Sequence, residues 1–118
     1  MKSINSKQSI WQSFDIEVTS FNYSKSQKNG LMGYANVYVS ELDIALKSIP
    51  VFNNKGDISV SSPANPPSPE NNNTWYKIMD FYSKHDQQVF EKKVLEAFAK
   101  YCRENDIPLD LGSGMLHA

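Results

Sequence analysis

Apolar and polar residues alternate along much of the first half of the chain. The apolar residues Leu31, Ala35, Val37 and Val39 stand two or four positions apart, and in an extended strand such positions lie on one face. Similar alternating blocks occur before and after this segment. Together they predict strands at residues 14–23, 31–39, 42–52, 57–61 and 75–82, the last of them rich in aromatic residues.

Two local signals indicate how these strands are connected. Residues 53–56, Asn-Asn-Lys-Gly, are typical of a hairpin turn. Within the 42–52 block the apolar positions change from even to odd between Leu46 and Ile49. A slip of one residue would turn the core face toward solvent, so we expect a β-bulge near Ser48.

The last regular element has the spacing of a helix. Phe90, Val94 and Tyr101 recur at intervals of four and seven residues, which predicts an amphipathic helix at about 84–104. Ser83, with an aspartate three residues later, resembles the start of a capping box. The expected fold class is therefore α+β: an antiparallel sheet of four to five strands with one C-terminal helix packed on a face.

The length of 118 residues predicts a single domain. The expected parts are an N-terminal tail at 1–13, one domain at 14–106 with a loop rich in proline and asparagine at 61–74, and a C-terminal tail at 107–118. We expect Trp11 to tuck against the sheet, although it could instead anchor a partner. The 61–74 loop is either an exposed connection or a proline-rich ligand for a partner.

Composition limits the possible partners and the compartment. Twelve basic and thirteen acidic residues give a net charge of -1, which provides no general attraction to nucleic acid or to anionic membranes. No apolar run reaches the roughly 20 residues needed to cross a bilayer, and the first residues lack the apolar core of a signal peptide. The single cysteine fits a reducing compartment. The expected location is cytoplasmic, with no membrane partner.

The residues that could carry catalysis are few and scattered. His85 and His117 have no metal-ligand spacing. Cys102 lies on the apolar stripe of the predicted helix, where a small buried side chain is the expected role. Asp15 and Glu17 form a carboxylate pair on a strand, where a solvated edge is the expected role and an acid/base pair the alternative. We therefore expect no enzyme, no metal and no cofactor.

Basic side chains occur on the predicted helix and near the turns. Lysine and arginine supply the phosphate contacts of nucleic-acid-binding proteins. Glutamates share the same helix surface, so a mixed, solvated face is the alternative. The candidate nucleic-acid-binding residues are Lys92, Lys93, Lys100, Arg103, Lys47 and Lys55.

Aromatic residues are expected on the sheet face that a single helix leaves uncovered. Exposed surface of this kind typically contacts a partner. A homodimer with symmetric sheet contacts is the expected arrangement. The candidate dimer-interface residues are Tyr34, Tyr38, Trp75 and Phe81.

A series of short motifs extends from Phe14 to about Arg103. They are an Ile-x-Val strand (Ile16, Val18), an x-Ala-x-Val-x-Val strand (Ala35, Val37, Val39), Ile44, an Ile-x-Val pair before a glycine turn (Ile49, Val51, Gly56), Val60 leading to Ser-Pro (Ser62, Pro63), and a helix with Val94, Leu95 and Phe98. This series resembles the SpoVG-like family (stage V sporulation protein G, the septation regulator). The resemblance implies a four- or five-stranded sheet with a C-terminal helix. It also implies a homodimer formed by sheet pairing that binds DNA and RNA through basic helix and loop residues.

Two functional classes follow from these observations. The first is a bacterial nucleic-acid-binding regulator that acts as a homodimer without catalysis, and it depends mainly on the resemblance. The second is a small protein-binding adaptor or inhibitor of the mobile-element or phage type. Exposed aromatic residues, the proline- and asparagine-rich loop and the near-zero net charge favour this second class.

Overall fold

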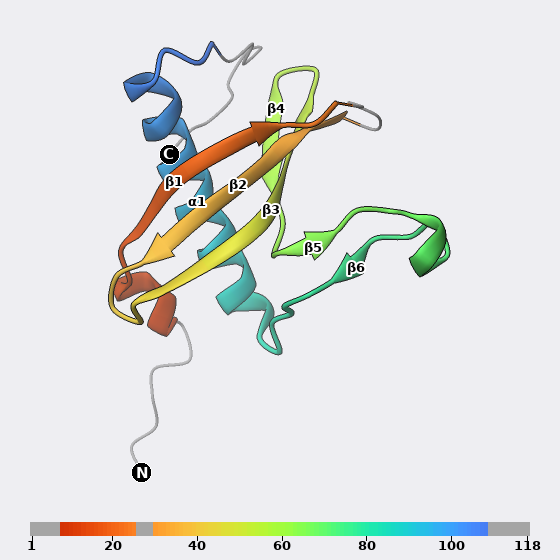
Figure 1. The fold of residues 1–118 in the computed structure, drawn as a ribbon. Helices are drawn as coiled ribbons and strands as arrows, with labels where there is room; N and C mark the ends of the chain where they lie inside the picture. The colour runs from red at the N-terminus through yellow and green to blue at the C-terminus, as the bar shows by residue number, and fades with distance from the viewer. Residues whose placement is uncertain (1–7, 26–29, 109–118) are drawn as a thin grey trace.

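The computed structural model describes residues 8–25 and 30–108, and the chain folds into a four-stranded antiparallel sheet, a small two-stranded sheet and a C-terminal helix (Figure 1). The main sheet has the order β1 (Ile16–Tyr23), β2 (Leu31–Val39), β3 (Ile44–Asn54) and β4 (Asp57–Val60). Sequential strands are neighbours, as short turns favour. The predicted α+β class is confirmed. The expected tail residues 1–7 and 109–118, including His117, lie outside the described residues.

The bulge predicted near Ser48 is present in β3. Ala35 of β2 pairs with Ile49, and Val37 pairs with Leu46, with a register shift between the two pairs. Ser48 adopts a positive φ of 61°, and its backbone N–H donates to Asn36 Oδ1 at 3.1 Å. The extra residue of β3 keeps Leu46 and Ile49 on one face despite their odd separation.

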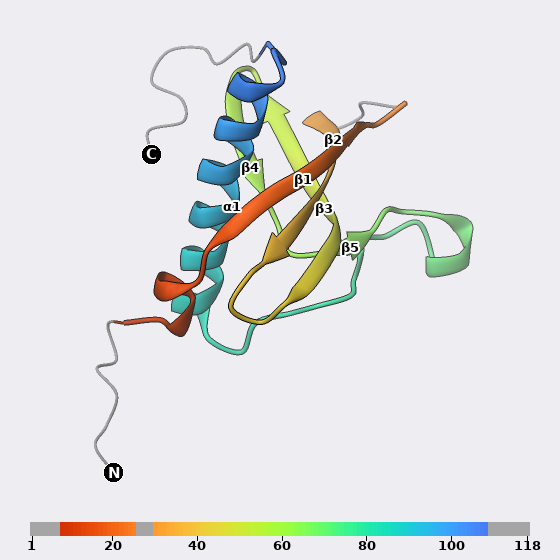
Figure 2. The same ribbon diagram turned by 60° about the vertical axis from the view of Figure 1, so that its left-hand side comes forward.

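Helix α1 (Lys84–Glu104) covers one face of the main sheet (Figure 2). Its start is capped by the Ser83 side chain, which accepts a hydrogen bond from the Asp86 N–H at 3.1 Å. Phe90, Val94 and Phe98 are fully buried against sheet residues such as Val37 and Ile49. The apolar stripe of the helix therefore forms one layer of the core, and the inner face of the sheet forms the other.

The residues before β1 are anchored by Trp11. They form a short 3-10 helix, η1 (Ile10–Ser13). The Trp11 ring makes edge-on contacts with Phe14, Phe81 and Phe90 at centroid distances of 5.1, 5.8 and 5.2 Å. Trp11 thus packs at the start of α1 as well as next to β1, and residues 9–13 belong to the folded unit.

The predicted fifth strand at 75–82 is wrong. Only β6 (Tyr76–Lys77) is extended, and it pairs with β5 (Ala64–Asn65) in a separate sheet. Prolines at 66, 67 and 69 cannot donate backbone hydrogen bonds, so the ladder ends after two residue pairs. The expected strand at 42–52 also begins later, at Ile44, because a turn with Asp43 at φ 52° precedes it.

The 61–74 segment is more ordered than a simple exposed loop. Ser62, Pro63 and Ala64 are buried, and the Pro63 carbonyl accepts the Ile78 N–H at 3.0 Å. Beyond them, β5, the 3-10 helix η3 (Pro69–Asn71) and β6 form an arm, residues 64–77, that projects from the main sheet (Figure 1). Among the described residues, no helix is long and apolar enough to cross a membrane.

Candidate functional site

Lys92 and Arg103 lie on the solvent side of α1, and both are exposed. They are eleven residues apart, which is about three turns, so they share one side of the helix about 16 Å apart along its axis. Neither forms an ion pair with another described residue. Lys100 lies between them, and its Nζ is 4.0 Å from Glu104 Oε2 in an exposed pair. Pairs of this kind are weak, so Lys100 is available to a stronger partner.

Lys93 has a different environment from the other helix lysines. Its Nζ donates to the backbone carbonyl oxygens of Gln12, at 2.9 Å, and of Phe14. These two contacts connect the middle of α1 to the segment that contains η1. The sequence places Lys93 among the phosphate contacts, whereas in the fold it is half-buried and holds the N-terminal segment.

The two remaining candidate lysines lie on the sheet. Lys47 is exposed within the bulged part of β3, and Lys55 is exposed in the β3–β4 turn with a φ of 59°. The structure therefore groups Lys92, Lys100 and Arg103 on one helix, and Lys47 and Lys55 belong to other elements.

Tyr34 and Tyr38 lie on the face of β2 that points away from α1, because they alternate with the buried residues Ala35 and Val37. The Tyr38 hydroxyl donates to Asp43 Oδ1 at 2.7 Å. This hydrogen bond, with smaller contributions from burial and the carboxylate charge, raises the pKa of Tyr38. Burial raises the pKa of Tyr34. Both phenols therefore remain neutral hydrogen-bonding groups at neutral pH.

Trp75 extends the aromatic surface, and Phe81 does not. The Trp75 ring contacts Phe52 at a centroid distance of 5.9 Å, and Phe52 alternates with buried Val51, which puts it on the same open face as the tyrosines. Phe81 instead packs on Trp11 and on Phe90, the latter at 5.2 Å, beside the start of α1. Of the four candidate interface residues, Phe81 thus belongs to the edge of the core.

A polar network occupies the middle of the open face, and the sequence analysis did not identify it. The Asn36 Nδ2 donates to Ser20 Oγ at 2.8 Å, and its Oδ1 accepts the Ser48 N–H. The Thr19 hydroxyl donates to the Asn36 carbonyl at 3.2 Å. The available signal was an asparagine, Asn36, between the apolar residues Ala35 and Val37 of a predicted strand. The network stabilises the bulges and gives the open face hydrogen-bonding groups.

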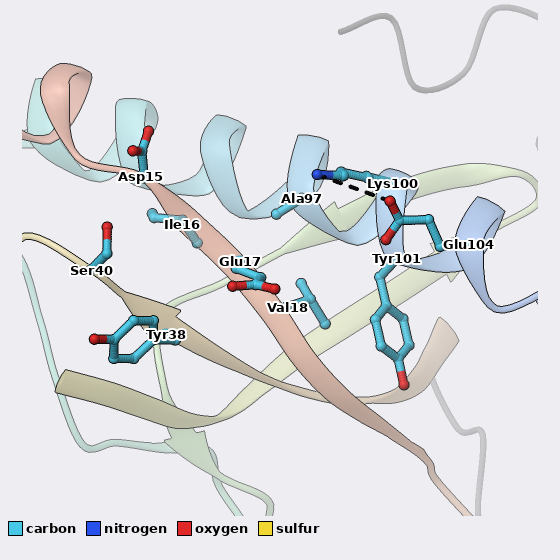
Figure 3. A pocket seen from close by; sticks show the side chains of 10 residues that line it. All are labelled: Asp15, Ile16, Glu17, Val18, Tyr38, Ser40, Ala97, Lys100, Tyr101 and Glu104. Atoms are coloured by element: carbon cyan, nitrogen blue, oxygen red, sulfur yellow. Dashed lines mark ion pairs between the residues drawn. The ribbon is translucent and has the colours of Figure 1, made fainter. Parts of the chain in front are cut away.

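A groove of about 400 Å³ lies between β1 and the second half of α1 (Figure 3). One side is formed by β1, and the other by the exposed flank of the helix. Its lining includes Ile16, Glu17, Val18, Ala97, Lys100 and Tyr101, and on the far side of β1 it reaches Tyr38 and Ser40. Its volume lies within the range of small ligand pockets, which is about 300–1,000 Å³.

The described residues offer little for metal or nucleophilic chemistry. Within them, no cluster of three or more histidine, cysteine or acidic side chains could hold a metal ion. Cys102 is buried on α1, and burial raises the pKa of its thiol to about 11. The thiol therefore stays protonated at neutral pH and packs in the core.

Comparison of the chain with family models, with curated proteins and with solved structures found no match.

Proposed function

We propose that this chain is a nucleic-acid-binding regulatory protein of the SpoVG-like type, acting without catalysis as a homodimer in the bacterial cytoplasm. The observation that carries the proposal is the basic stripe formed by Lys92, Lys100 and Arg103 on the solvent side of α1. All three side chains are exposed, and Figure 2 shows no other described element over the side of α1 that faces away from the sheet. The order of sheet and helix also agrees with what the resemblance implies about the fold.

The dimensions of the basic stripe suit a nucleic-acid backbone. The 16 Å between Lys92 and Arg103 corresponds to about five base pairs of duplex along its axis. Glu96 interrupts the stripe, and the net charge of the chain is -1, so the interaction must be local and sensitive to salt. Three phosphate contacts give a slope of log affinity against log salt of about -2.7, a loss of roughly 40-fold between 50 and 200 mM salt.

A titration tests this proposal directly. Fluorescence anisotropy with labelled duplex DNA, single-stranded DNA and RNA at low salt measures affinity and its salt slope. The triple variant Lys92→Ala, Lys100→Ala, Arg103→Ala should weaken binding and flatten the slope by about 2.7. The control variant Lys25→Ala, Lys77→Ala, Lys84→Ala makes the same change in charge outside the stripe and should leave the slope nearly unchanged. Absence of binding to all three nucleic acids at low salt would exclude the proposal.

The sheet lysines need a separate variant. Lys47→Ala with Lys55→Ala removes two basic groups that lie on β3 and in the β3–β4 turn. If these groups also contact phosphates, the slope should flatten by about 1.8. An unchanged slope would restrict the binding surface to the helix.

A second candidate function is a protein-binding adaptor or inhibitor. The observation that favours it is the apolar surface on and next to the arm: Tyr76 and Ile78 are exposed by 61% and 57%, and Tyr82 is fully exposed. Large apolar groups gathered on a projecting segment are typical of partner contacts. If the chain binds no nucleic acid, cross-linking mass spectrometry in cells should find a protein cross-linked to the native chain. The variant Tyr76→Ser, Ile78→Ser, Tyr82→Ser should lose that cross-linked protein.

A further inference from the structure

Strand β1 forms one edge of the main sheet, and its outer side has free hydrogen-bonding groups. The Ser40 N–H donates to the Asp15 carbonyl at 3.2 Å, so the backbone of Asp15 points toward β2. Backbone groups of successive residues alternate between the two sides of an antiparallel strand. The N–H and C=O groups of Ile16 and Val18 therefore point outward. No hydrogen bond from another described residue reaches them.

Residues of α1 line the groove beside this edge. Ala97 and Tyr101 line the groove together with Ile16 and Val18. Helix α1 crosses β1 at an angle, and its C-terminal half extends beyond the outer side of β1 (Figures 1 and 3). An additional strand would lie about 4.8 Å from β1, within the groove. Alternate side chains of the added strand would then contact the apolar groups of α1. The others would lie on the open face of the sheet, the face away from α1.

The charge of the groove is negative. Asp15, Glu17 and Glu104 contribute three carboxylates, and Lys100 contributes one ammonium group, whose Nζ lies 4.0 Å from Glu104 Oε2. No ion pair or hydrogen bond from a described residue reaches the carboxylates of Asp15 and Glu17. Glu17 lies on the outer face, next to Tyr38 of β2. A basic side chain in an added strand would meet this unpaired carboxylate.

We propose that the free edge of β1 binds an extended segment of a partner protein in which apolar and basic residues alternate. The apolar residues pair with Ile16 and Val18 and face α1, and the basic residues pair with Glu17. Backbone hydrogen bonds supply affinity, and the alternation supplies selectivity, as in other cases of strand addition. This interaction does not depend on nucleic-acid binding, although Lys100 borders both the groove and the basic stripe.

The charge pattern also explains why a second copy of this chain is not the occupant. In a symmetric antiparallel pairing of two β1 strands centred on Glu17, the two Glu17 side chains would face each other. Centring on Ile16 would place Asp15 opposite Glu17. Like charges directly opposite each other destabilise a sheet, and charged residues on an edge prevent sheets from joining. A register further along would meet the bulge between Val18 and Ser20.

Synthetic peptides test the proposal. The probe is a fluorescent seven-residue peptide, Lys-Val-Lys-Val-Lys-Val-Lys, and the control is Lys-Lys-Lys-Lys-Val-Val-Val, which has the same composition. In antiparallel pairing, the valine amides bond to β1 and the lysine amides point away. Methylating the valine nitrogens should therefore weaken binding on the order of tenfold, and methylating lysine nitrogens should change it less than about threefold. Equal effects of the two methylations, or equal binding of the control peptide, would overturn the proposal.

Protein variants identify the edge. Glu17→Lys should weaken binding of the lysine–valine peptide and strengthen binding of the corresponding glutamate–valine peptide. Asp57→Lys makes the same charge change on β4, at the opposite edge of the sheet, and should alter neither. Hydrogen exchange of the Ile16 and Val18 amides should slow when the peptide binds. If the peptide instead dissociates a homodimer, or if Glu17→Lys changes the oligomeric state, the edge serves self-association and the proposal fails.

Discussion

The contacts of Trp11 predict that the segment before β1 is a main contributor to stability. A tryptophan side chain buries about 150–250 Å² when it is fully enclosed, and Trp11 is half-buried. Removing about 100 Å² from water contributes about 2.5 kcal/mol. The ring also makes edge-on contacts with Phe14, Phe81 and Phe90. Each contact contributes up to about 0.5–1.5 kcal/mol to stability beyond the buried area. Trp11→Ala should therefore lower the free energy of unfolding by about 2–4 kcal/mol.

Urea unfolding followed by circular dichroism measures this loss, and a thermal scan should show the midpoint falling by on the order of 10–20 °C. The other tryptophan provides a matched control. Trp75 is 38% exposed, and its one aromatic contact among the described residues is with Phe52. Trp75→Ala should cost less than Trp11→Ala by about 1–2 kcal/mol, because Trp75 loses one ring contact and Trp11 loses three. If Trp11→Ala changes stability by less than about 0.5 kcal/mol, or by no more than Trp75→Ala, Trp11 does not anchor the segment.

Four further predictions follow from particular contacts. A Cβ added at Gly33 would lie 2.3 Å from a backbone oxygen of β1, so Gly33→Ala should separate the first hairpin and lower the thermal midpoint sharply. Lys93→Ala should reduce stability by about 1–3 kcal/mol and leave the salt slope of nucleic-acid binding unchanged, which distinguishes it from Lys92→Ala. Burial raises the pKa of the Cys102 thiol from 9.0 to about 11, because the folded state disfavours the thiolate. The contribution of this thiol to the free energy of unfolding is therefore fully present below pH 9 and is lost as the pH rises through 11. Cys102→Ala should remove that part of the decline, measured as the difference in unfolding free energy between the two proteins at each pH. The double variant Tyr34→Ser, Trp75→Ser should convert the proposed homodimer into a monomer. Sedimentation at protein concentrations of tens of micromolar, on the order of the dissociation constant of a weak dimer, measures this change. Native protein that is already monomeric under these conditions would contradict the interface.

The open face and the basic stripe show which parts of the candidate site could be predicted. Tyr34 and Tyr38 were placed correctly on the face away from the helix, because alternation along a strand decides the face. The helical repeat puts Lys92 and Arg103 on one side of α1, whereas Lys93 of the same predicted set binds carbonyl groups of the N-terminal segment. Phe81 packs on Trp11 and Phe90 and not on the open face, because the strand predicted around it does not form.

The sequence by itself determined the elements whose signals are local. Strand alternation, the change of phase that requires a bulge at Ser48, and the capped amphipathic helix after Ser83 all depend on the repeat of one backbone conformation. Side chains two positions apart in a strand, or three and four apart in a helix, share a face whatever surrounds them. For this reason the four strands of the main sheet and the helix could be predicted without knowledge of any distant contact.

The tertiary structure alone decided which groups meet across long separations in the chain. The Lys93 ammonium group binds carbonyl groups 81 and 79 residues earlier, and Trp11 meets Phe81 and Phe90 at the start of α1. The groove beside β1 exists because α1 returns to the first strand of the sheet. No local period encodes such contacts, because they depend on how the sheet twists and where the helix crosses it. The surfaces available for binding are therefore a property of the packed layers.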